Sequence, residues 1–160
     1  MADKLAVGER APDFSLPDQL GQPINLKQLK GTPVVLYFYP KDDTPGCTKE
    51  ACDFRDSHAA ITKAGAVVLG VSLDGADSHR KFIGKYQLPF SLLCDEDAKV
   101  SKAYGVYKEK NMYGRKYWGI ERTTVVVDGM GAVAALFRKV KVEGHAAEVL
   151  QVLKGLKAKR

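Results

Sequence analysis

Runs of apolar residues rich in β-branched and aromatic side chains recur along the chain and predict buried strands. Three long runs occupy residues 34–39, 66–71 and 123–127, and a short one occupies residues 91–94. Pro40 ends the first run, because proline has no N–H to donate to a sheet ladder. We therefore expect four central strands, the first of which stops at Pro40.

Apolar residues spaced three or four apart predict a helix directly after the first strand. Spacings of 4, 3, 4 and 3 place on one helical face Cys47, Ala51, Phe54, His58 and Ile61. Gly65 favours the end of this helix, since glycine readily adopts the left-handed conformation found there.

Three more helices are expected further along the chain. Asp77 or Ser78 is the predicted cap of a helix that runs through Tyr86. Residues 97–104 predict a short helix, and residues 144–156 predict a final one with an apolar side.

Turn signals place shorter strands near the two ends of the chain. Residues 12–16 are expected to pair with residues 24–26. The turn signal at 128–131 makes residues 132–138 the hairpin partner of the strand before it. Alternating strands and helices favour parallel pairing, and the late hairpin adds antiparallel strands. We predict an α/β protein of thioredoxin-like type, with a mixed central β-sheet flanked by helices and an N-terminal β extension.

The composition is that of a globular chain. Of 160 residues, 45% are hydrophobic and 28% are charged, which suits one domain spanning residues 1–160. No apolar run approaches the ~18 residues of a membrane span, and residues 1–5 lack the apolar core of a signal peptide. We expect a cytoplasmic protein with no membrane partner.

The formal net charge of +6 raises the question of a nucleic-acid partner. The basic residues are scattered, however. The two densest groups are Lys108, Lys110, Arg115 and Lys116, and the terminal Lys154, Lys157, Lys159 and Arg160. The second group is typical of a solvated helix end, where cations favour the helix dipole. We expect no nucleic-acid partner.

Three cysteines do not suit a secreted disulfide scaffold, so the question becomes whether one thiol is reactive. Cys47 falls in the first turn of the expected helix, where unpaired N–H groups and the dipole favour a thiolate. Thr44 can direct its hydroxyl to the same place, and Gly46 lets backbone approach closely. The alternative is that Cys47 is a small buried apolar side chain, as many unpaired cysteines are.

Cys52 follows Cys47 by five residues, which on an α-helix is about 140° of rotation and ~7.5 Å of rise. The two Cα atoms would then be ~8–9 Å apart, beyond the ~7 Å that a disulfide tolerates. Any bond between these thiols therefore requires the first turns of the helix to unwind.

Metal chemistry has little support in the sequence. There is no Cys-x-x-Cys motif, and the histidines His58, His79 and His145 fall on separate elements. The missing motif also counts against a disulfide reductase of thioredoxin type.

The pattern Pro40-x-x-x-Thr44-x-x-Cys47 resembles the active-site motif of the peroxiredoxins. Residues 37–56 as a whole resemble the subfamily of the bacterioferritin comigratory protein, or peroxiredoxin Q. Segments at 11–17, 89–95 and 119–128 are similar to the same subfamily, in order, so the resemblance covers essentially the whole chain.

The resemblance implies a role for each site residue. Cys47 would attack the O–O bond of a hydroperoxide and become a sulfenic acid. Thr44 and Arg122 would hold the peroxide oxygens, with backbone N–H groups near Gly46 and Cys47. Pro40 would shield the sulfenate from solvent.

The resemblance also implies how the enzyme is recycled. Cys52 would be the resolving cysteine of an intramolecular disulfide, which thioredoxin or glutaredoxin would reduce. No metal, haem or flavin is implied, and the subfamily is usually monomeric. Some relatives carry the resolving cysteine near residues 77–86, where this chain has none. Cys94 is the remaining candidate, although its place in a short apolar strand favours burial.

Two open points remain. Arg55 could pair with Asp56 or assist the site. A thiol–disulfide exchange protein on the same fold, and a basic binding or scaffold protein with inert thiols, are the alternatives to a thiol peroxidase. The pair Thr44 and Arg122 favours the peroxidase, because peroxide needs a polar pocket that simple exchange does not.

Overall fold

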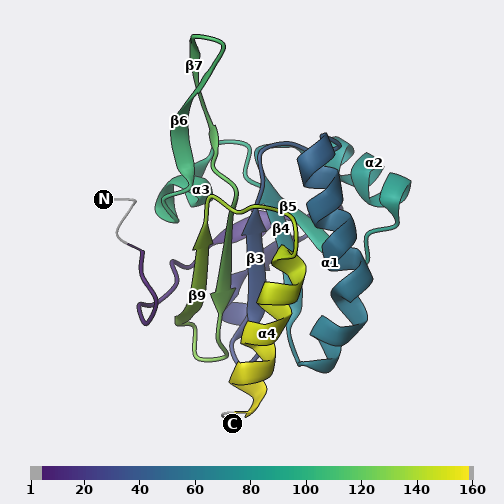
Figure 1. Cartoon of the computed structure of the whole chain (residues 1–160), viewed down its shortest axis with the longest axis vertical. Coiled ribbons are helices and arrows are strands. Elements are labelled where there is room, and N and C mark those ends of the chain that lie inside the picture. Colours follow the sequence, from purple (N-terminus) through teal and green to yellow (C-terminus); the bar gives the residue numbers. More distant parts are fainter. Residues whose placement is uncertain (1–4, 159–160) are drawn as a thin grey trace.

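A five-stranded mixed sheet forms the centre of the computed structural model, which describes residues 5–158 (Figure 1). Its strand order is β5-β4-β3-β8-β9. The strands are β3 (Val34–Phe38), β4 (Val67–Ser72), β5 (Ser91–Cys94), β8 (Thr123–Val127) and β9 (Val133–Arg138). The pairs β3–β4 and β4–β5 are parallel, and β8 runs antiparallel to both β3 and β9. The predicted α/β fold with a mixed central sheet is confirmed.

Both faces of the sheet are covered, which explains the unbroken apolar runs. The helices are α1 (Pro45–Lys63), α2 (Ala76–Tyr86), α3 (Lys99–Ala103) and α4 (His145–Ala158). On one face, α1 and α4 lie side by side over the sheet (Figure 1), and Val35 and Tyr37 of β3 pack into this layer. The alternate residues Leu36 and Phe38 face the other layer, with Tyr104 and the N-terminal segment.

A two-stranded hairpin of β1 (Ser15–Pro17) and β2 (Pro23–Asn25), followed by the 3-10 helix η2 (Leu26–Leu29), forms the expected N-terminal β extension. Within residues 5–158, no helix is both long enough and apolar enough to cross a membrane.

A second hairpin, β6 (Tyr107–Met112) and β7 (Arg115–Ile120), was not predicted and extends away from the sheet (Figure 1). Most of its side chains are exposed, so it has no apolar alternation to reveal it. Tyr113 and Gly114 form its two-residue turn, both with positive φ, as hairpin turns of this kind require. The basic group from Lys108 to Lys116 lies on this hairpin.

The predicted cap of α2 is wrong. The helix begins at Ala76 with Gly75 as its N-cap, so neither Asp77 nor Ser78 occupies that position. Both side chains have other partners: Asp77 pairs with Arg80, and the Ser78 hydroxyl donates to Asp42. The third helix is also shorter than expected, spanning only Lys99–Ala103.

Candidate active site

The β3–α1 junction places Cys47 in the first turn of α1. Thr44 is the N-cap of this helix, but its hydroxyl donates to the Lys41 carbonyl at 2.9 Å instead of capping the helix. Pro45 has no N–H, and the first bond of the helix runs from Thr48 N to Thr44 O. The N–H groups of Gly46 and Cys47 lie before this bond, in the first turn, and have no carbonyl of the helix to donate to. They can therefore donate to an anion or a polar ligand.

Strand pairing brings Arg122 to the same place. In the antiparallel β3–β8 ladder Phe38 pairs with Thr123, so the residue before β8 lies beside the loop after β3. Arg122 Nη2 donates to Cys47 Sγ at 3.3 Å, although 75 residues separate them. Cys47 is buried, with 2% of its surface exposed. The Cys47 sulfur is therefore buried in the first turn of α1 and in contact with a guanidinium.

Glu50 completes the group and was missed in the sequence analysis. Its Oε1 accepts a hydrogen bond from Arg122 Nη1 at 2.6 Å, and its side chain is 1% exposed. Burial raises the pKa of Glu50 to about 7, despite the opposing effect of Arg122. Its Oε2 is buried and has no hydrogen-bond partner among the described residues 5–158. The signal that could have found it is its spacing of three from Cys47, which puts both on one helical face.

Arg122 is shared between two acceptors. Burial alone would lower the pKa of Arg122, but Glu50 and Cys47 raise it above its usual range. The guanidinium therefore stays charged beside the sulfur. Gly46 allows this contact, because a Cβ at that position would lie 3.1 Å from Arg122 Nη2.

The structure thus brings Cys47, Gly46 and Arg122 together. Thr44 is at the same helix end and half-buried, but within residues 5–158 no hydrogen bond joins it to Cys47 or Arg122. Pro40 is half-buried at the end of the β3 segment, in the same loop.

The other thiols are separate from this contact. Cys52 is half-buried further along the continuous helix α1, and both it and Cys47 are free thiols. Cys94 is buried, and burial together with neighbouring carboxylates raises its pKa to about 11. A thiol with so high a pKa is protonated at neutral pH and a poor nucleophile. Cys94 therefore has the surroundings of an inert core residue.

Arg55 has partners of its own. Its Nε lies 3.0 Å from Asp56 Oδ1, and its Nη1 donates to the Tyr86 carbonyl at 2.8 Å. Of the two alternatives for Arg55, the pairing with Asp56 is the one observed, and the bond to Tyr86 connects α1 to α2.

A second group of side chains has the residue types that bind metal ions. Asp42, Asp74 and His79 have potential metal-ligand atoms within 4.8 Å of one another. Asp74 Oδ2 accepts from Ser72 Oγ and from the Asp42 backbone N–H, while Asp42 Oδ2 accepts from Ser78 Oγ and lies 2.7 Å from His79 Nδ1. All three side chains therefore have hydrogen-bond partners without an ion.

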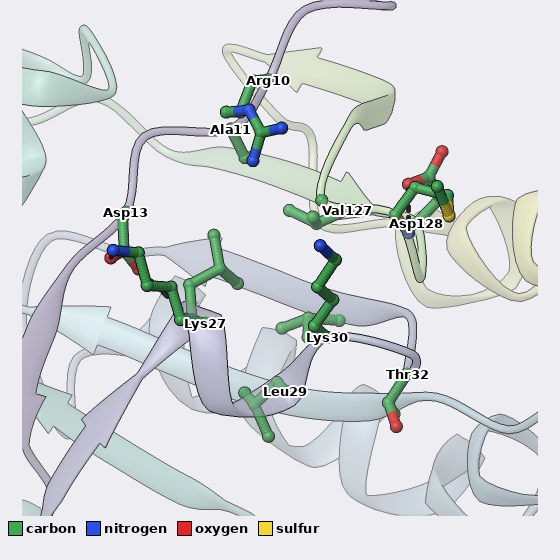
Figure 2. A pocket seen from close by; sticks show the side chains of 13 residues that line it. Arg10, Ala11, Asp13, Lys27, Leu29, Lys30, Thr32, Val127 and Asp128 are labelled. Atoms are coloured by element: carbon green, nitrogen blue, oxygen red, sulfur yellow. Dashed lines mark hydrogen bonds and ion pairs between the residues drawn. The ribbon is translucent and has the colours of Figure 1, made fainter.

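A cavity of about 350 Å³ lies between η2 and the ends of β3 and β8, with cationic Arg10, Lys27 and Lys30 among its lining residues (Figure 2). It is lined by Val34, which begins β3, and Val127, which ends β8. Cys47 follows the opposite end of β3. This cavity is therefore at the other end of the sheet from the Cys47 site.

Comparison with known proteins agrees with this geometry. Residues 7–136 match the AhpC/TSA family. The chain is 55% identical to a Coxiella burnetii protein that carries the name peroxiredoxin bcp, over 91% of this chain and 97% of that protein. It is 48% identical to peroxiredoxin Bcp of Bacillus subtilis, over 97% of this chain and 99% of that protein.

A solved structure of the Xanthomonas campestris bacterioferritin comigratory protein, studied for its alkyl peroxide reduction, superposes with a TM-score of 0.88. The two chains share 42% identity, and the match covers 95% of this chain and 99% of that one. The chain therefore belongs to the AhpC/TSA family and, within the peroxiredoxins, to the bacterioferritin comigratory protein or peroxiredoxin Q subfamily.

Proposed function

We propose that this chain is a thiol peroxidase that reduces hydrogen peroxide and organic hydroperoxides through Cys47. The observation that carries the proposal is the contact of Arg122 with a buried Cys47 at the start of α1. The alkyl peroxide reduction for which the Xanthomonas campestris structure is described supports the same chemistry. The role is antioxidant defence.

The first step is attack of the Cys47 thiolate on the terminal oxygen of the hydroperoxide. An S–O bond forms, the O–O bond breaks, and the leaving oxygen takes a proton to become an alcohol or water. Negative charge moves from sulfur to the leaving oxygen, so donors must be placed where that charge develops. The guanidinium of Arg122 and the free N–H groups of Gly46 and Cys47 are such donors.

Thr44 and Pro40 take supporting roles. The Thr44 hydroxyl, at the helix N-cap, would bind a peroxide oxygen once it turns from the Lys41 carbonyl. Pro40, half-buried in the same loop, would limit the access of water to the sulfenic acid.

The second step returns Cys47 to a reducible form. The Cys52 thiolate attacks the sulfenic sulfur, an S–S bond forms, and hydroxide leaves as water after taking a proton. Because the two residues lie five apart on one helix, the start of α1 must unwind first. Thioredoxin, or glutaredoxin, then reduces the disulfide. This cycle needs no second subunit, which fits a monomer with one domain, residues 1–160. It does need a steady supply of reductant, which fits the cytoplasm.

The alternative is a thiol–disulfide exchange protein that uses the same two cysteines. The exchange reaction has no leaving oxygen to stabilise. A half-buried guanidinium held between Cys47 and Glu50 therefore favours the peroxidase.

Replacing the nucleophile tests the proposed function. Cys47→Ser should abolish peroxide consumption in a thioredoxin-coupled assay, because a serine hydroxyl does not become an anion at neutral pH. Cys94→Ser is the matched control and should retain activity. Peroxide consumption by Cys47→Ser at the wild-type rate would refute the assignment.

Peptide mass mapping tests the resolving step. One equivalent of peroxide should produce a Cys47–Cys52 disulfide within one chain. Cys52→Ser should complete its first turnover and then accumulate sulfenic or over-oxidised Cys47. A Cys47–Cys94 bond, a bond between chains, or full turnover of Cys52→Ser with thioredoxin would each contradict local unwinding.

Glu50 should make stability depend on pH. Its pKa is raised by burial to about 7, so the stability its protonated form provides is complete below pH ~4.5 and is lost as pH rises through about 7. Glu50→Gln cannot ionise. Between pH 5 and pH 8 its free energy of unfolding should rise relative to wild type by about 2–3 kcal/mol, measured by urea denaturation. Glu109→Gln, an exposed control, should follow wild type, and parallel curves for Glu50→Gln and wild type would contradict the account.

A further inference from the structure

One side chain of the exposed β3–α1 loop is buried. Lys41 and Asp43 are exposed, whereas Asp42 between them is only 7% exposed. A buried carboxylate is costly unless it is paired and hydrogen-bonded. Asp42 therefore requires a specific set of partners.

Those partners come from three other parts of the chain. Asp42 Oδ1 accepts from the Tyr39 hydroxyl at 2.5 Å. Its Oδ2 accepts from Ser78 Oγ and lies 2.7 Å from His79 Nδ1, both on α2. Its backbone N–H donates to Asp74 Oδ2, just after β4, at 2.8 Å.

His79 is fully buried, and each of its ring nitrogens faces an acceptor. Nδ1 faces the Asp42 carboxylate, and Nε2 lies 2.9 Å from the Leu93 carbonyl of β5. Both nitrogens can donate only when the ring carries two protons, so this geometry fits the imidazolium cation. Burial alone would lower the pKa of His79, but Asp42, Leu93 and Asp74 raise it.

The groups that face the Asp42–His79 pair are acidic or neutral. Asp74 follows β4, Tyr39 follows β3, and Cys94 ends β5 with its thiol near Asp42. They favour a cation at His79. The loop has a second tie in Asp43, which accepts from Lys85 and Tyr86 of α2, but this contact is exposed and correspondingly weak.

The loop held in this way leads directly into the helix turn that carries Cys47. Disulfide formation with Cys52 requires that turn to unwind, whereas reaction with peroxide requires it to be folded. We propose that Asp42 and His79 are positioning residues, and that their ion pair sets the balance between the folded site that reacts with peroxide and the opened site that forms the disulfide. This inference rests on the proposed function, but its first two tests involve no peroxide.

The first test is amide hydrogen exchange of the reduced protein over residues 43–52. His79→Gln and Asp42→Asn each remove the charge pair and should speed exchange there by about tenfold, the effect expected for losing a hydrogen bond to a charged group. The exchange rate of the double variant should be close to that of either single variant, because each single substitution already removes the ion pair. His145→Gln, another buried histidine that bonds Thr124, controls for general destabilisation. Unchanged exchange over 43–52, or a change equal to that of His145→Gln, would overturn the proposal.

The second test needs no substitution. The ¹⁵N chemical shifts of the His79 ring in the reduced wild type at pH 7 should be those of the doubly protonated ring. A neutral ring at pH 7 would show that no ion pair holds the loop.

The third test follows a single turnover in a stopped-flow instrument. In His79→Gln, sulfenic acid should form more slowly and the disulfide more quickly than in wild type, and less Cys47 should be over-oxidised at high peroxide. If both rates fall together, the pair is merely structural and the proposal fails. If wild type itself does not react with peroxide, the proposed function fails, while exchange and ring shifts still decide whether the pair holds the loop.

Discussion

The site depends on one shared guanidinium. Arg122 lies between Cys47 and Glu50, with a hydrogen bond to each. Two buried groups that can both become anions thus share one cation, and a charge placed on one weakens the hold of the cation on the other. Burial raises the pKa of Glu50 to about 7, so near neutral pH Glu50 exchanges between its protonated and ionised forms. When it is protonated, the charge of Arg122 acts mainly at the sulfur and at the reacting oxygens.

The sheet makes this contact possible. Because β3 and β8 are antiparallel neighbours, the end of one strand lies beside the start of the other. The loop with the thiol and the residue with the guanidinium meet there. The two proposed steps require different conformations of this junction. The folded start of α1 presents Cys47 to peroxide, but it also holds Cys47 too far from Cys52 for a disulfide. Asp42 belongs to that junction, and its contact with His79 connects the junction to α2. His79 in turn lies against the Leu93 carbonyl of β5.

Much of this fold could be predicted from local patterns. The strands at 91–94 and 123–127 match the predicted bounds, because each is a short apolar run with clear ends. The β6–β7 hairpin could not be predicted, since most of its side chains are exposed and its apolar residues do not alternate regularly with polar ones. The N-cap of α2 was placed two to three residues late, because neither candidate side chain caps the helix: Asp77 pairs with Arg80 within α2, and Ser78 donates to Asp42.

The candidate site was predicted only in part. The motif around Cys47 and the position of Arg122 were evident from the resemblance, and the structure places their side chains in contact. Glu50 was missed because an acid beside Lys49 suggests a solvated helix face. The contact of Asp42 with His79 joins residues 37 apart on different elements, and no local pattern reports such a pairing. Buried charges of this kind become visible only when the tertiary arrangement is known.

The most direct measurement is the rate constant for oxidation of reduced Cys47 by hydrogen peroxide, compared between wild type and Arg122→Gln. Loss of one charged donor to the transition state should lower it by about 10²–10³-fold. Arg10→Gln, a control beside the distant cavity, should keep the wild-type value. An Arg122→Gln rate within about twofold of wild type would contradict the central claim that this guanidinium makes Cys47 a peroxidase nucleophile.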